Sequence, residues 1–85
     1  MLIIALKDQI AVDTPYIQFF PAKSIDLLKR DLKNVFKQPN SIFATNPEDF
    51  DVVCIADVDE KTGICTPKTD LLFNLAILKD EAQVQ

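Results

Sequence analysis

Apolar and polar residues come in blocks along the first quarter of the chain, and these blocks predict two extended segments. Met1–Leu6 is an uninterrupted apolar run, the pattern of a central strand that is buried on both faces of a sheet. A polar break follows, after which residues 10–12 can continue an extended ribbon. Tyr16–Pro21 is aromatic and favours β structure, and its proline ends the segment.

The spacing of apolar residues then changes to that of a helix over Ile25–Lys37. Ser24 is a suitable N-cap, Asp26 lies in the first turn, and Lys33 and Lys37 lie toward the C-terminal end, as the helix dipole favours. One apolar face is formed by Ile25, Leu28, Leu32, Val35 and Phe36. Gln38-Pro39 ends the helix.

Turn-forming residues dominate the linker that follows. Asn46 as a cap and Pro47 at the first helical position predict one short helical turn. We expect Ile42, Phe43 and Phe50 to anchor this linker to the core.

A second strand is predicted over residues 51–59. Period-two alternation places Val52, Cys54, Ala56 and Val58 on one face and Val53 and Ile55 on the other. Gly63 supplies a left-handed turn position, and an edge strand returns over residues 64–67, where Pro67 limits it. Leu71–Lys79 is apolar almost all round and fits either a short helix capped by Asp70 or a further strand.

These elements predict an α+β fold in which one amphipathic helix packs across a small, mainly antiparallel sheet. A chain of 85 residues with 48% hydrophobic residues has room for one small domain. We place that domain at residues 1–79 and expect residues 80–85 to form a frayed tail. No apolar run approaches the roughly 18 residues of a membrane span, so we expect no membrane partner.

The composition excludes several chemistries. The chain has no His, which removes His-based triads, His general bases and His metal ligands. Its single Gly excludes glycine-rich nucleotide loops, and its two cysteines cannot form a thiolate zinc site alone. We therefore expect no catalytic residues, no metal and no cofactor, and a protein that is not an enzyme.

Cys54 and Cys65 lie on the two arms of the predicted hairpin. If residues 60–63 form the loop, Cys65 pairs with Val58, four residues away from Cys54. That offset is about 13 Å along a strand, beyond the reach of a disulfide. Both cysteines are expected to be reduced, chemically quiet apolar residues, which fits a cytosolic compartment.

Charge is unevenly distributed along the chain. The net charge is −4, yet residues 23–37 contain five of the nine basic residues and only two of the thirteen acidic ones. That segment has a net charge of +3 and the remainder −7. A basic helix flank can follow a phosphate backbone, and exposed aromatic residues can stack on bases. The candidate nucleic-acid-binding residues are Lys23, Lys29, Arg30, Lys33 and Lys37 for phosphate, with Tyr16 and Phe19 for stacking.

The order of several short motifs resembles a known family. The motifs are Phe19-Phe20-Pro21, then residues 38–43 with Pro39 and Phe43, then Asn46–Phe50, and then Asp57–Gly63. In order and spacing, this series resembles the small nonstructural protein of gokushoviruses, microviruses with single-stranded DNA genomes. Gln38 stands where that family usually has Asp, and Val58 stands where it usually has an aromatic residue.

The resemblance implies a non-enzymatic phage accessory protein in the host cytoplasm. It implies binding to single-stranded DNA during genome replication or packaging. The alternative is a homo-oligomeric protein–protein interaction module that acts on host replication or capsid assembly proteins, because the body of the chain is acidic.

One helix covers only one face of a small sheet, so the other face needs a partner. We expect a homo-oligomer, most simply a two-fold dimer, that covers this face. The candidate interface residues are Ile3, Val53, Ile55, Leu71, Leu75 and Leu78. Such a dimer would carry two basic helix flanks and bind a long strand with higher avidity.

Overall fold

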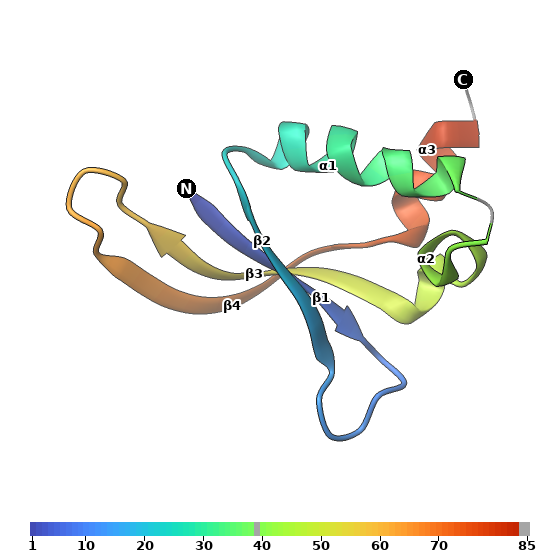
Figure 1. Ribbon diagram of the computed structural model, residues 1–85, viewed down its shortest axis with the longest axis horizontal. Coiled ribbons are helices and arrows are strands. Elements are labelled where there is room, and N and C mark those ends of the chain that lie inside the picture. The colour runs from blue at the N-terminus through green and yellow to red at the C-terminus, as the bar shows by residue number, and fades with distance from the viewer. Residues whose placement is uncertain (39, 84–85) are drawn as a thin grey trace.

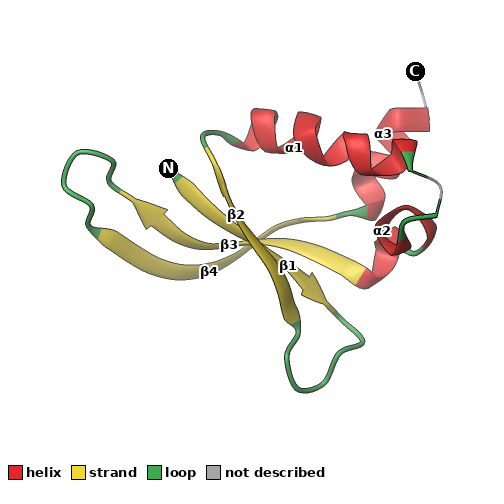
Figure 2. Cartoon of the chain, viewed as in Figure 1, coloured by secondary structure: helices red, strands yellow, loops and turns green. Residues whose placement is uncertain are grey.

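The computed structural model describes residues 1–38 and 40–83, without the side chains of residues 35 and 80–83. Its centre is a four-stranded antiparallel sheet in the order β2-β1-β3-β4 (Figure 1). The strands are β1 (Leu2–Asp8), β2 (Tyr16–Ala22), β3 (Phe50–Val58) and β4 (Cys65–Asn74). The described helices lie on one side of the sheet and beside one end of it (Figure 2). The predicted α+β class is confirmed.

Strand β1 is central, as its unbroken apolar run predicts. It pairs with β2 on one side and β3 on the other, and Ile4, Ala5 and Leu6 are buried. Residues 9–12 do not continue the strand, because β1 ends at Asp8 and the chain bends there. The Asp8 carboxylate accepts a hydrogen bond from the Ile10 amide at 3.0 Å, which stabilises the bend.

The predicted helix forms in two parts, α1 (Ile25–Lys33) and a 3₁₀ turn over Asn34–Lys37. Ser24 is the N-cap, and its hydroxyl accepts a hydrogen bond from the Leu27 amide at 3.2 Å. Leu28 and Leu32 are buried against the sheet, whereas Ile25 is partly exposed. The side chain of Val35 lies outside the described part of the chain.

The linker forms α2 (Ile42–Thr45) and a 3₁₀ turn over Pro47–Asp49. The rings of Phe43 and Phe50 meet edge to face with centroids 4.7 Å apart, so these two residues anchor the linker. Two expectations were wrong. Ile42 is 59% exposed, and Asn46 occupies the N-cap position of the Pro47–Asp49 turn without making a side-chain capping hydrogen bond.

The β3–β4 hairpin turns as predicted. Gly63 has a φ of 77°, and the Asp59 carboxylate accepts a hydrogen bond from the Lys61 amide at 2.9 Å. Cys65 lies opposite Val58 in the register. The limit expected at Pro67 was wrong, because β4 continues to Asn74. A proline is tolerated there since β4 is an edge strand and the register is irregular beside it.

Irregular registers also change which residues share a face. The pairing of β1 with β3 shifts between Ile3 and Ile4, so Ile55 is skipped and Ala56 pairs with Ile3. Ala56 therefore shares a face with Ile3 and Val53 rather than with Val52 and Cys54. The strict alternation expected for this strand was wrong because a bulge inserts one residue.

The C-terminal segment divides into the end of β4 and a helix, α3 (Ala76–Gln83), which packs against α1. The Asn74 side chain, rather than Asp70, accepts a hydrogen bond from the Ala76 amide, at 3.0 Å. Leu75 and Leu78 are 0% exposed and belong to the core beneath α1, so their expected place in an oligomer interface was wrong. The tail boundary at residue 80 falls inside α3, while Val84 and Gln85 lie outside the described residues.

The hydrophobic core lies between the sheet and the helices. It contains Ile4, Leu6, Leu28, Leu32, Phe50, Val52, Cys54, Phe73, Leu75 and Leu78. The other face of the sheet, here called the open face, has no helix over it among the described residues (Figure 1). The register aligns two apolar rows across this face, Phe19-Ala5-Val53-Leu71 and Pro21-Ile3-Ala56-Pro67. A third row, Tyr16-Lys7-Asp51-Asn74, is polar.

Candidate nucleic-acid interface

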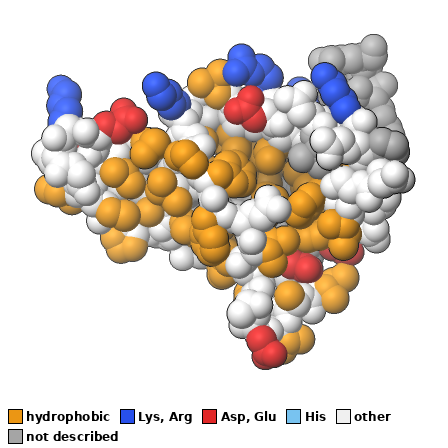
Figure 3. All heavy atoms as spheres, in the orientation of Figure 1, with side chains coloured by type: hydrophobic (Ala, Val, Ile, Leu, Met, Phe, Trp, Pro, Cys, Tyr) orange, Lys and Arg blue, Asp and Glu red, His pale blue; other side chains and the backbone are white. Residues whose placement is uncertain are grey.

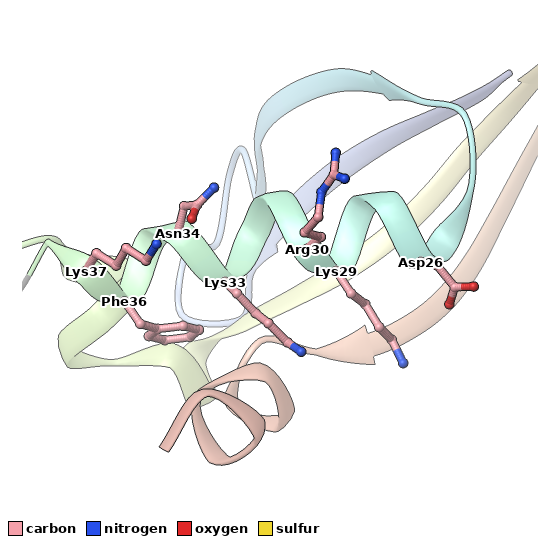
Figure 4. A pocket seen from close by; sticks show the side chains of 7 residues that line it. All are labelled: Asp26, Lys29, Arg30, Lys33, Asn34, Phe36 and Lys37. Carbon is pink, nitrogen blue, oxygen red and sulfur yellow. The ribbon is translucent and has the colours of Figure 1, made fainter. Parts of the chain in front are cut away.

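The outward side of α1 and of the 3₁₀ turn after it carries most of the predicted phosphate-binding residues. Leu28 and Leu32 face the core, and Arg30, midway between them, is exposed on the opposite side of the helix. A shallow hollow of about 550 Å³ lies over this surface. It is lined by Asp26, Lys29, Arg30, Lys33, Asn34, Phe36 and Lys37 (Figure 4). The hollow thus combines four cationic side chains with one carboxylate.

The four cations do not form one straight stripe. Lys29 and Lys33 extend to the same side of the helix, and Arg30 extends to the other side (Figure 4). In a continuous α-helix Lys37 would follow Lys33 after a rotation of about 40°. The intervening residues form a 3₁₀ turn with three residues per turn, which rotates Lys37 by roughly a further 80°. Lys29, Lys33 and Lys37 are spaced four residues apart in the sequence, but this change of helix type prevents them from forming one row. The cations therefore lie on both sides of the hollow.

The basic side chains differ in how firmly they are held. The Lys29 ammonium lies 5.4 Å from the centroid of the Phe73 ring, so this side chain covers the edge of the core. Arg30 lies 3.7 Å from the Asp31 carboxylate, but both side chains are largely exposed and water screens the pair. Arg30 and Lys37 are exposed and lie where a phosphate can reach them.

Lys23 lies beside a second hollow of about 290 Å³ at the start of α1. Arg30 lines both hollows, so it connects Lys23 with the remaining basic side chains. Five of the seven predicted nucleic-acid-binding residues therefore lie along one side of the molecule. In Figure 3, Lys and Arg side chains are seen along the upper edge, where α1 lies.

Tyr16 and Phe19 are not part of this surface. Phe20 packs against the core on the side of α1, so alternation along β2 turns Phe19 to the open face. Tyr16 is in register with Lys7 and lies under it, with the ammonium 5.8 Å from the ring centroid. The sheet therefore separates the two predicted stacking residues from the basic surface.

Comparison with known proteins identifies the family. A family model described as Phage ORF5 protein matches residues 1–77. The chain belongs to the Phage ORF5 protein family. Searches of curated proteins and of solved structures found no significant match. None of the helices described in this Phage ORF5 protein is long and apolar enough to cross a membrane.

Two features of this Phage ORF5 protein were not predicted from its sequence. Asn34 lines the larger hollow, and its position four residues after Arg30 was the available signal. Lys7 belongs to the polar row of the open face, which only the strand register reveals. Acidic residues gather elsewhere, at the end of β3 and in its turn, where Asp57 lies 3.6 Å from the N-terminal amine.

Proposed function

We propose that this Phage ORF5 protein is a non-enzymatic accessory protein that binds single-stranded DNA in the host cytoplasm, during genome replication or packaging. The observation that carries the proposal is the hollow over α1, which combines four cations with one carboxylate in an otherwise acidic chain. The resemblance to gokushovirus nonstructural proteins supports the same function, since those phages have single-stranded DNA genomes.

The proposed mode of binding is through phosphates. Arg30 and Lys37 contact the backbone directly because they are exposed, and Lys23 extends the contact past the start of α1. Asn34 adds an uncharged amide that can donate a hydrogen bond to a phosphate oxygen. Contacts of this kind position a strand without reading its sequence, so we expect little sequence preference.

Charge reversal on α1 and on the 3₁₀ turn after it tests this proposal. Arg30→Glu combined with Lys37→Glu should weaken binding to labelled single-stranded DNA and reduce the slope of log K against log salt by about 1.4, or about 0.7 for each lost contact. Both side chains are exposed, so the fold should be unaffected. Fluorescence anisotropy at several salt concentrations measures both quantities.

The matched control is Lys61→Glu combined with Lys68→Glu, which changes the net charge by the same four units outside α1. The control should retain the salt slope of the wild type. An equal loss of affinity in both double variants would show that only the net charge matters, which contradicts a site on α1.

The open face favours a second function. Its two apolar rows support a protein–protein interaction module that acts through a second copy, a phage protein or a host protein. Absence of DNA binding by the wild type at low salt would favour this module as the sole function.

A further inference from the structure

The open face is apolar across its whole width. The row Phe19-Ala5-Val53-Leu71 crosses all four strands, with one residue from each. Phe19 is 61% exposed and Leu71 is 64% exposed, one on each edge strand. Ala5 and Val53, in the middle of the row, are only 0% and 3% exposed although no described helix covers them. The exposed apolar side chains of this row therefore lie on the two edge strands.

The edges of the sheet are poor places for another strand to add. Both edge strands contain a proline, Pro21 in β2 and Pro67 in β4. Proline lacks the amide donor that an added strand requires, and proteins use it to prevent pairing at sheet edges. Association through the sheet is therefore expected to use the face.

The polar row carries complementary charges, which indicate what kind of partner the open face binds. Lys7 of β1 and Asp51 of β3 are neighbours in the register. The Asp51 carboxylate accepts hydrogen bonds from the side-chain amides of Gln9 and Asn74, at 2.8 and 2.9 Å. Both donors are uncharged, so neither of them neutralises the charge of Asp51. The face thus presents one cation and one anion at matching positions on either side of its midline, whereas a DNA-binding face would need an excess of cations.

We propose that the open face binds the open face of a second copy, related by a two-fold axis that runs parallel to the strands between β1 and β3. This rotation places β1 over the partner's β3 and β2 over the partner's β4. Lys7 then faces the partner's Asp51, and Phe19 faces the partner's Leu71, with each contact made twice. An axis across the strands would instead place each strand over itself and lose these pairings.

The size of the face corresponds to an interface at the lower end of the range for specific association. Four strands about 4.8 Å apart, each at least seven residues long at about 3.3 Å per residue, form a flat sheet of roughly 20 × 23 Å. The side chains that project from this face add accessible surface to that flat area. A standard interface takes about 800 Å² of accessible surface from each partner, about a seventh of the 5608 Å² of this chain. Two such sheets packed about 10 Å apart form a β-sandwich, a common way to bury sheet faces.

Complementary variants test the pairing. Wild type should sediment at equilibrium with twice the 9.6 kDa mass of the chain at micromolar concentration. Phe19→Lys alone and Leu71→Asp alone should each be monomeric, because each places a charge against an apolar side chain. An equimolar mixture should recover the dimer, since Lys at position 19 then faces Asp at position 71 and the second pair remains Phe and Leu.

The control is Ile42→Lys, a change at an exposed apolar residue on α2 that should leave the dimer intact. Circular dichroism verifies that each variant is folded, and Phe19→Glu with Leu71→Lys provides a second complementary pair. A monomeric wild type would overturn the proposal. Monomeric mixtures of both folded pairs would overturn the two-fold arrangement. Because mass is measured without DNA, the result is independent of the proposed function.

Discussion

At the residue scale, the two cysteines show how one register produces two different environments. Cys54 is buried, and its thiol donates a hydrogen bond to the Ala56 carbonyl at 3.4 Å. Cys65 is exposed at the start of β4, although the sequence predicted a quiet apolar residue there. The apolar neighbour Ile64 did not decide the burial of Cys65, because the edge strand extends past the core at that point.

Thiol titration should therefore distinguish the two cysteines. We expect one equivalent to react rapidly in the native protein and a second only after denaturation, because reaction requires access to the sulfur. Absorbance with a chromogenic disulfide reagent follows both phases. Cys65→Ser should remove the rapid phase, and two rapid equivalents in the native wild type would contradict the burial of Cys54.

At the scale of elements, the start of α1 depends on one side-chain hydrogen bond. The Ser24 hydroxyl accepts from the Leu27 amide, and Asp26 adds a favourable charge in the first turn. This terminus also orients the residues around the basic hollow, because Lys29 and Arg30 follow within two turns. The local signal for this cap was visible in the sequence, and the prediction was confirmed.

Ser24→Ala should lower the free energy of unfolding by about 1 kcal/mol, the usual cost of losing an N-cap. For a domain of this size, that corresponds to a decrease in Tm of about 4–8 °C. Thermal unfolding followed by circular dichroism measures the change. Ser24→Asp keeps an acceptor at the cap and should melt close to wild type, so equal melting of all three proteins would refute the role of the cap.

At the scale of the whole molecule, α1 and the open face lie on opposite sides of the sheet. In the proposed dimer the two basic helices therefore point away from each other, with both sheets between them. The expected higher avidity for one long strand would require that strand to pass around both sheets, because the two basic flanks lie on opposite sides of the dimer. The arrangement favours contacts with two separate segments of DNA.

The dimer should consequently bridge two DNA strands. Wild type should retain a fluorescent single-stranded oligonucleotide on beads that carry a second, unlabelled one. Leu71→Asp should bind each oligonucleotide in solution without bridging them, and its mixture with Phe19→Lys should restore retention. Retention by the monomeric variant alone would contradict bridging through the dimer.

Features that depend on neighbours within a few residues could be predicted from the amino-acid sequence alone. The apolar run of β1, the Ser24 cap, the left-handed Gly63 and the pairing of Cys65 with Val58 were all correctly predicted. Local chemistry decides each of them: backbone conformation, a single hydrogen bond or the length of one turn. The basic residues of the candidate site were recognised for the same reason, since charge can be counted along the chain.

The surface to which each residue belongs depends instead on how distant segments pack together. Bulges moved Ala56 to the other face, β4 continued through Pro67, and Leu75 and Leu78 entered the core instead of an interface. The sheet also separated Phe19 and Tyr16 from the basic helix. Each outcome depends on pairing between distant segments, where a shift of one residue reverses every side chain beyond it. Sequence periodicity specifies that two faces exist, and packing decides which one is covered.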